Sequence, residues 1–489
     1  MRSCVPATLL VFRNGKANVF LGIDLGTGSV KLMLVDADGG EHVAVRSYPV
    51  ESQAPGLAET DPEAWIEAIR LAVCTLPPLG GLRAVGLSGQ MHGIVPLGRD
   101  SLAPLHHAIL WADRRGAPYL DRFTHLPRDM GERIINAPAA GLAATTLLWL
   151  KDERPDDYRR IGTVLFPKDW VRAVLTGAVM TDFSDASGSL LYDFEKREWY
   201  ADLLSELGLA RGLLPEIRQA VDCAGRITAE AARRTGLPEG VPVAVGAGDA
   251  PAGMYGSGVE SPFEVQLSVG TAAQISRPIP SDRLPERAPS LNVFEGVLAS
   301  QRYRVAAMLN AGLALEWVRG LFHADWEELY KELETRGATG APDLTFLPYL
   351  TGERTPYMNP DARGAWVGLS LHHAADDLLL AALLGVACSI RLGLDTLGTA
   401  GVERVVAVGG SLRYPFWRKL LATVIERPLT VLNQKDMSAR GAARLAATMA
   451  HETMARAGGG TVTQHPEPAP WVEGYYRAFI EQYRRLFPG

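Results

Sequence analysis

The sequence predicts an α/β protein with two related domains. Apolar strand patterns alternate with amphipathic helix patterns along most of the 489 residues, as in proteins whose helices cover a sheet. Two segments, 19–36 and 263–276, read as strand, Gly-Thr turn and strand. We interpret them as the starts of two domains that meet near residue 255. The alternative is a chance recurrence of Gly-Thr in a chain with 50 glycines.

The length supports this division, because single hydrophobic cores stop growing at roughly 250–300 residues. We place the domains at 19–255 and 256–489. Residues 1–18 lack a clear signal-peptide pattern and precede the first strand pattern. We therefore expect an N-terminal extension over 1–18 that does not belong to the fold.

The first strand unit is not a dinucleotide-binding motif. A helix opens after the glycines of that motif, but here Val30, Leu32 and Leu34 recur with a period of two. That period predicts a second strand and therefore a hairpin. A third strand is expected over 41–50 after a glycine turn.

Helices and strands alternate downstream of this hairpin. Asp61 as N-cap and Pro62 predict a helix over 61–76, and Gly177 is expected to end a helix over 168–175. Further strands are expected over 83–89, 241–248, 303–308, 344–350 and 404–410, and further helices from 311, 375, 414, 438 and 471.

Composition argues against several classes of protein. A net charge of −6 without a basic stripe disfavours nucleic acid and anionic membrane as partners. Four cysteines without a CxxC pair disfavour structural zinc and a secreted disulfide framework, which favours a reducing cytoplasm. The longest apolar run, 378–390, is too short to span a bilayer and predicts a buried helix. A small-molecule ligand fits this composition better.

The first glycine turn suits phosphate. In "DLGTGSVK" the backbone N–H groups of the turn converge on one point, a concavity that accepts phosphate oxygens. Asp24 precedes the turn and could hold Mg²⁺ through water; the alternative is an ordinary hairpin with a capping aspartate. A facing second turn at Gly270 and Thr271 would make a clamp around a polyphosphate. Two such turns and two aspartates suit phosphoryl transfer.

Asp249 ends the apolar run of "AVGAGDAPAGM" among small residues that leave its side chain free to face a cleft. The alternative is an N-cap before a helix with Pro251 in its first turn.

Two loops offer further candidates. "LSGQMHG" places Gln90, Met91 and His92 where polar groups beside an apolar one suit a sugar, although a lone loop histidine is more often solvated. In the loop 346–356, Glu353 and Arg354 predict an ion pair with a structural role.

These motifs resemble those of the FGGY carbohydrate kinases, and among them most closely the xylulose kinases. The resemblance runs from Val19 to the last helix and includes "DLGTGSVK", "SGQMHG", "GAGDA", "LSVGTA", "FLPYLTGERTP", "VGGSLRYPFW" and "ARGAARLA" in order. It implies two actin-like (ribonuclease-H-like) ATPase domains around a hinged cleft. The sugar and first phosphate turn would lie in the N-terminal domain and the nucleotide in the C-terminal domain. It also implies ATP, Mg²⁺ and a cytoplasmic enzyme, and a homodimer is common among such kinases.

The resemblance assigns roles to individual residues. Asp249 matches the catalytic base, and Asp24 matches the carboxylate that organises Mg²⁺ through water, with Asp249 as a second candidate metal ligand. Met91 and His92, beside Gln90, match the sugar-contacting loop. The residues implied to bind the nucleotide are Gly26, Thr27, Ser29, Lys31, Gly270, Thr271, Gly312, Glu316, Gly409 and Gly410.

The implied reaction is ATP-dependent phosphorylation of the terminal hydroxyl of a ketopentose, D-xylulose above all. Ala250 stands where xylulose kinases usually have Asn, Ala143 and Thr146 replace a frequent Thr and Lys, and Ser411 replaces a third glycine. One alternative is therefore a kinase for another ketose or polyol. Another is a non-catalytic sugar-sensing relative, which should have lost its base or a phosphate turn.

Overall fold

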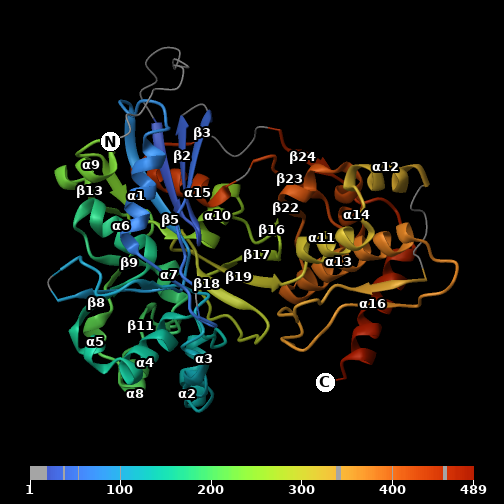
Figure 1. Ribbon diagram of the computed structural model, residues 1–489, viewed down its shortest axis with the longest axis horizontal. Helices are drawn as coiled ribbons and strands as arrows, with labels where there is room; N and C mark the ends of the chain where they lie inside the picture. The colour runs from blue at the N-terminus through green and yellow to red at the C-terminus, as the bar shows by residue number, and fades with distance from the viewer. Residues whose placement is uncertain are drawn as a thin grey trace.

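Two seven-stranded sheets form the centres of two lobes (Figure 1). The computed structural model describes residues 19–36, 39–52, 54–99, 101–336, 343–398, 400–434, 436–454 and 460–488. The N-terminal extension expected over 1–18 lies outside the described residues.

The first sheet has the order β13-β14-β5-β1-β2-β3. β1 (Val19–Leu25), β2 (Ser29–Asp36) and β3 (Glu41–Ser47) form the predicted antiparallel hairpins, and β5 (Leu82–Gly89) runs parallel to β1. β14 (Pro242–Ala244) and β15 (Ala247–Gly248) pair with β5, and β13 (Cys223–Arg226) pairs with β14. The expectation of one strand over 241–248 is wrong, because Gly246 takes a φ of +91° and bends the chain between β14 and β15.

Helices from distant parts of the chain cover the two faces of this sheet. α1 (Pro62–Val73), capped by Asp61 as predicted, and α6 (Pro167–Thr176), ended by Gly177, bury Trp65 and Trp170 against one face. α15 (Met437–Met449) covers the other face, where its red ribbon lies beside the blue strands in Figure 1. A Cβ on Gly22 would lie 1.9 Å from the Ala439 carbonyl oxygen, so this strand glycine permits the close approach of α15. The division at 255/256 assigns α15 to the second domain, whereas in space it packs on the first sheet.

The second sheet repeats the order of the first. β19 (Gln301–Met308), β17 (Ala273–Pro280) and β16 (Glu264–Val269) are antiparallel, and β22 (Arg404–Val408) and β23 (Leu429–Val431) continue parallel to β16. The sequence β3-β2-β1-β5-β14 in the first sheet has the same directions. β18 (Asn292–Glu295) and β24 (Val462–Gln464) form the edges of the second sheet. The shared order supports two related units over a chance recurrence of Gly-Thr.

Helices α11 (Gly312–Phe322), α13 (Ala375–Leu397), α14 (Pro415–Ile425) and α16 (Trp471–Leu486) build the core of the second lobe. α13 is long and apolar enough to cross a membrane, but 78% of its most apolar window is buried inside this chain. It is therefore the buried helix that the apolar run predicted. The strand expected over 344–350 covers only β20 (Thr345–Leu347), which ends before Pro348.

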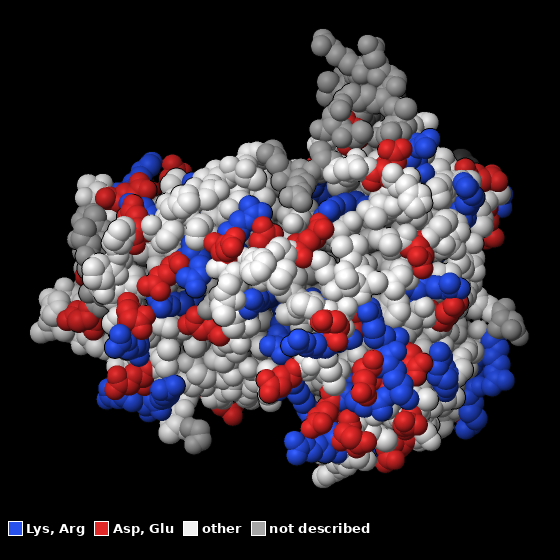
Figure 2. Space-filling model, turned by 180° about the vertical axis from the view of Figure 1, so that it is seen from behind, with Lys and Arg blue, Asp and Glu red and all other residues white. Residues whose placement is uncertain are grey.

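Most of the remaining elements lie in a large insertion in the first lobe, and the sequence patterns did not predict them. They are β4 (Glu59–Thr60), β6 (Val95–Gly98), β7 (Ala108–Ile109), η1 (Ala117–Tyr119), α2 (Asp121–Thr124), α3 (Arg128–Ile134), α4 (Ala143–Glu153), α5 (Pro155–Arg160), β8 (Ile161–Leu165), β9 (Met180–Asp182), α7 (Phe183–Ser187), β10 (Tyr192–Asp193), β11 (Glu198–Trp199), α8 (Ala201–Leu207), η2 (Arg211–Leu213), β12 (Glu216–Arg218), α9 (Ala229–Thr235), α10 (Asp249–Ser257), α12 (Trp326–Arg336), β21 (Ala365–Val367) and η3 (Gly410–Arg413). Figure 2 shows acidic and basic side chains mixed over one face of the molecule.

Candidate active site

A cavity of about 920 Å³ draws its lining from both sheets. Lys31 of β2 and Asp249 of α10 come from the first lobe, and Gly270, Gly409 and Gly410 come from the ends of β16 and β22. Lys31 and Gly410 are more than 370 positions apart in the sequence. The cavity therefore brings together the predicted base and parts of both predicted phosphate turns.

Asp249 is the first residue of α10 and follows directly on β15. Gly248 occupies the N-cap position, so the alternative in which Asp249 caps the helix is wrong. The Asp249 carboxylate accepts a hydrogen bond from the N–H of Ala250 at 2.8 Å and lines the cavity. Burial, and then repulsion from Asp24, raise the pKa of Asp249 to about 7. A carboxylate with such a pKa can accept a proton near neutral pH.

Asp24 lies on β1 opposite Ser88 in the parallel pairing with β5, and is 5% exposed. The Ser88 hydroxyl donates to Asp24 Oδ1 at 2.9 Å. Burial raises the pKa of Asp24, and the Ser88 hydrogen bond and Lys31 oppose that rise. Two mutually repelling carboxylates, Asp24 and Asp249, offer the hard oxygen ligands that Mg²⁺ prefers.

Lys31 connects the first turn with α15. Its Nζ lies 2.6 Å from Asp436 Oδ1, just before α15 begins. Burial opposes the charge on Lys31, but Asp436 holds the pKa of this ammonium above its ordinary value. Lys31 is therefore a cation at the cavity wall that an anionic ligand can reach.

The rest of the first turn forms the predicted hairpin but lies outside the cavity lining as far as the described residues show. Gly26 N–H donates to the Ser29 carbonyl at 3.0 Å and closes the turn. The Thr27 hydroxyl accepts from Trp111 Nε1 at 2.9 Å. The Gly26 carbonyl accepts from the Tyr48 hydroxyl.

The second turn is supported by α11. The N–H of Gly312 donates to the Gly270 carbonyl at 3.0 Å, and the N–H of Leu313 donates to the Thr271 carbonyl at 2.9 Å. A Cβ on Gly312 would lie 2.4 Å from the Gly270 carbonyl oxygen, so only glycine permits this contact. Glu316 lies one turn further on, where its carboxylate accepts from Arg319 at 2.7 Å and Trp326 at 2.8 Å outside the cavity lining.

The predicted sugar loop follows β5 and reaches the base through Met91. A Cβ on Gly248 would lie 2.7 Å from Met91 Sδ, so the thioether packs directly against the residue before Asp249. His92 takes a φ of +75°, and its Nδ1 lies 2.9 Å from the Gly188 carbonyl oxygen. Burial lowers the pKa of His92 to about 4, which makes it neutral and leaves Nε2 as an acceptor. Gln90 Nε2 donates to the Gly26 carbonyl at 3.4 Å, which joins this loop to the first turn.

The predicted ion pair between Glu353 and Arg354 is wrong for the part of the chain that the structure describes. Glu353 Oε1 instead accepts from the backbone N–H groups of Leu309 and Arg354, each at 2.7 Å. Burial raises the pKa of Glu353 to about 7. The Arg354 side chain is exposed.

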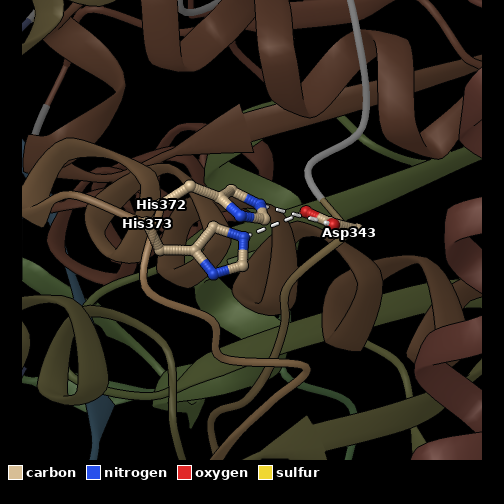
Figure 3. Close-up of side chains that lie close together, drawn as sticks. All are labelled: Asp343, His372 and His373. Carbon is tan, nitrogen blue, oxygen red and sulfur yellow. Dashed lines mark hydrogen bonds and ion pairs between the residues drawn. The ribbon is translucent and has the colours of Figure 1, made fainter.

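A cluster outside the cavity contains Asp343, His372 and His373, whose side chains point toward one another (Figure 3). His373 Nε2 lies 2.9 Å from Asp343 Oδ1, while the Ser370 backbone N–H donates to His373 Nδ1 at 3.0 Å. A histidine that binds a metal through one nitrogen carries its proton on the other. Because Nδ1 of His373 is already an acceptor, its proton lies on Nε2 and is donated to Asp343. This geometry describes a hydrogen bond from neutral His373 to Asp343 and not a metal site.

Several residues at the site gave no sequence signal. Asp436 reaches Lys31 from the far end of the chain, and Arg413 and Arg418 line the cavity beside Gly409. For Ser88 the signal is the pairing of two predicted strands, because the parallel alignment of β1 with β5 places it opposite Asp24.

Both halves of the chain match known family models. Residues 19–256 match the N-terminal domain of the FGGY family of carbohydrate kinases, and residues 267–450 match the C-terminal domain of that family.

Full-length relatives agree with these matches. The chain is 33% identical to a xylulose kinase of Escherichia coli, covering 88% of this chain and 89% of the relative. It is 30% identical to a xylulose kinase of Bacillus subtilis, covering 87% of each. The crystal structure of a xyloylose kinase from Brucella ovis superposes with a TM-score of 0.85 at 33% identity, covering 96% of this chain and 99% of that one.

Proposed function

This chain belongs to the FGGY family of carbohydrate kinases, and we propose that it transfers the γ-phosphoryl group of ATP to the terminal hydroxyl of D-xylulose. Membership of the family makes it a phosphotransferase with an alcohol acceptor. The choice of D-xylulose is supported by the two xylulose kinases that are at least 30% identical over most of both chains.

One observation carries the proposal. Asp249 lines the same cavity as Lys31, Gly270 and Gly409, and its pKa is raised to about 7. A base and a polyphosphate cradle on one cavity are what in-line phosphoryl transfer needs, since its catalysis rests on positioning and electrostatic stabilisation.

Asp249 accepts the proton of the terminal sugar hydroxyl as that oxygen attacks the γ-phosphorus. The new oxygen–phosphorus bond forms while the bond from the γ-phosphorus to the β,γ-bridging oxygen breaks, so that ADP leaves and the proton remains on Asp249. General base catalysis of this kind contributes about 10²- to 10⁴-fold. Met91 and His92 pack next to this base without lining the cavity in the part of the chain that the structure describes. We expect the neutral His92 Nε2 to give the ketose a polar contact and the Met91 thioether to give it an apolar one.

The nucleotide is bound mainly through backbone and apolar groups. Gly270, Gly409 and Gly410 bring backbone close to the phosphates, and Lys31 supplies a positive charge. Arg413 and Arg418 also line the cavity. The wall that suits the adenine is formed by Val408, Leu412, Val431 and Leu432.

Asp24 and Asp249 fit Mg²⁺ by the chemistry of their donors, because two repelling carboxylates gain from a cation beside them. Asp24 would hold the ion through water, with Asp249 as a second ligand. The ion neutralises charge on the phosphates when it is bound. A cytoplasmic location and a homodimer complete the proposal, and light scattering of the purified protein tests the dimer.

The experiment is a coupled assay of ADP release with ATP and Mg²⁺ over D-xylulose, L-xylulose, D-ribulose, L-ribulose, glycerol and gluconate. We expect the highest kcat/KM with D-xylulose and little release without sugar. Activity only on another sugar would locate the change in specificity at Ala250 and the 141–149 segment. Lack of turnover with every sugar would favour the non-catalytic relative and refute the proposal.

A further inference from the structure

Five charged side chains form a buried cluster behind the segment that carries Asp249. Lys168 Nζ lies 2.6 Å from Asp169, 2.8 Å from Asp182 and 3.0 Å from Asp185. Arg172 completes the cluster 2.7 Å from Asp169, and all five residues are fully buried. Burying charges costs free energy that their pairing repays only in part, so such a cluster is weak evidence for stability alone. The site described above does not use any of these residues.

A series of hydrogen bonds connects this cluster to Gly248, the residue before Asp249. The Gly248 N–H donates to Ser184 Oγ at 2.9 Å. The Ser184 hydroxyl donates in turn to Asp182 Oδ2 at 2.5 Å. Asp182 Oδ1 faces Lys168. The direction of both hydrogen bonds is fixed. The Ser184 hydroxyl donates its only proton to the Asp182 carboxylate, and its oxygen accepts the Gly248 N–H.

A second series of hydrogen bonds connects the cluster to Val245, on the other side of the bend at Gly246. Arg172 Nη1 donates to the Val245 carbonyl at 2.8 Å and to Asp169 Oδ1 at 2.7 Å. Asp169 Oδ1 is also the atom that pairs with Lys168. The two tethered groups, Val245 C=O and Gly248 N–H, flank Gly246, where the chain bends with a φ of +91°. Both sides of the bend are therefore connected, through Asp169 and Asp182, to the ammonium group of Lys168.

We propose that Ser184 is a positioning residue for the phosphoryl transfer, which fixes Asp249 by anchoring the Gly248 N–H to the buried charge cluster. The inference rests on the proposed function of Asp249 as the base. Reacting groups must approach to about 3–3.5 Å in line, and a misplacement of about 1 Å can cost about 10²-fold in rate. Removal of the anchor therefore lowers kcat while nucleotide binding, which uses other walls of the cavity, stays unchanged.

The chain offers a closely matched control in the same helix. Ser187 in α7 is buried like Ser184, and its hydroxyl also donates to one group and accepts one backbone N–H. It donates to the Ser184 carbonyl at 2.8 Å and accepts from the Glu295 N–H at 3.0 Å, neither of which belongs to the Asp249 segment. Ser187→Ala thus removes the same kinds of contact without releasing Gly248.

The experiment compares Ser184→Ala, Ser184→Thr and Ser187→Ala in the full chain by steady-state kinetics and by hydrogen exchange at the Gly248 amide. We expect Ser184→Ala to lower kcat about tenfold or more with KM for ATP within about twofold, and to speed exchange at Gly248 about tenfold or more. Ser184→Thr retains the hydroxyl and restores both values toward those of the unmodified chain. Ser187→Ala leaves both within about twofold.

Equal kcat in Ser184→Ala and Ser187→Ala would overturn the positioning role. Hydrogen exchange at Gly248 can be measured without turnover. It therefore distinguishes a failure of the positioning role from a failure of the proposed function. If the unmodified chain phosphorylates none of the sugars, the proposed function fails. The anchor is then judged by exchange alone, and equal exchange at Gly248 in the two alanine variants refutes it.

Discussion

Asp249→Asn separates the catalytic role of this carboxylate from its effect on stability. The variant keeps the shape of the side chain and removes the charge. We expect turnover to fall about 10²- to 10⁴-fold, the contribution of a well-placed general base. We also expect the folded protein to gain stability at pH 8, because burial and Asp24 disfavour the ionised carboxylate in the folded state.

The size of the stability gain follows from the pKa. A rise from the ordinary value of 3.8 to about 7 corresponds to about three tenfold steps of about 1.36 kcal/mol each, so about 4 kcal/mol is an upper bound. The carboxylate is only half-buried and borders a solvent-accessible cavity, which reduces the expected gain to about 1–2 kcal/mol. That corresponds to a rise in Tm of about 1–4 °C.

The stability gained by Asp249→Asn should decrease as the pH falls. A carboxyl whose folded-state pKa is raised destabilises the fold fully above pH 7 or so, and this cost disappears as the pH falls toward the unfolded-state value near 4. The Tm difference between Asp249→Asn and the unmodified chain should therefore shrink between pH 8 and pH 5, as differential scanning calorimetry can measure. A variant with near-normal turnover, or one that is less stable at pH 8 than at pH 5 relative to the unmodified chain, would refute this reasoning.

Three further predictions concern the same cavity. In a pH–rate profile, kcat/KM for the sugar should fall as the pH drops through about 7, because Asp249 must be ionised to accept a proton; a profile that stays flat to pH 5 contradicts this. Lys31→Met should raise KM for ATP about tenfold or more, the value of a lost charge-assisted hydrogen bond, and steady-state kinetics that show an unchanged KM would exclude a phosphate contact. Gly409→Ala should destabilise the fold by about 1–3 kcal/mol and so lower Tm, because φ is +149° and a Cβ would lie 2.1 Å from the Val269 carbonyl oxygen; the displaced backbone should also weaken ATP binding. Gly410→Ala is its control in calorimetry, since no atom lies within 4 Å of that Cβ, and equal effects would argue against strain at Gly409.

The sequence predicted features that depend on neighbouring residues. The glycine turns and the period of two defined both hairpins, and Asp61 and Gly177 marked helix ends that the structure confirms. The break at Gly246 was missed because the apolar pattern of 241–248 is continuous, whereas the groups that hydrogen-bond to both sides of the bend, Arg172 and Ser184, are far away in the sequence.

Long-range packing explains what else escaped prediction. α15 was expected as a closing helix, but nothing in its own pattern indicates that it covers the first sheet. The complementary signal lies in Gly22 and Gly86, strand glycines whose Cβ atoms would each lie 1.9 Å from a carbonyl oxygen of α15. The Glu353 carboxylate, assigned to its sequence neighbour, is instead held by the backbone N–H of Leu309 as well as that of Arg354.

Transfer of phosphate to the terminal hydroxyl of D-xylulose is tested most directly by identifying the product formed from D-xylulose and ATP by ³¹P–¹H correlation NMR. We expect ADP and a single phosphorylated sugar, with the phosphate on the terminal carbon, and no product with Asp249→Asn. A phosphate on another carbon, or no phosphorylated D-xylulose while ATP is consumed with a different sugar, would contradict it.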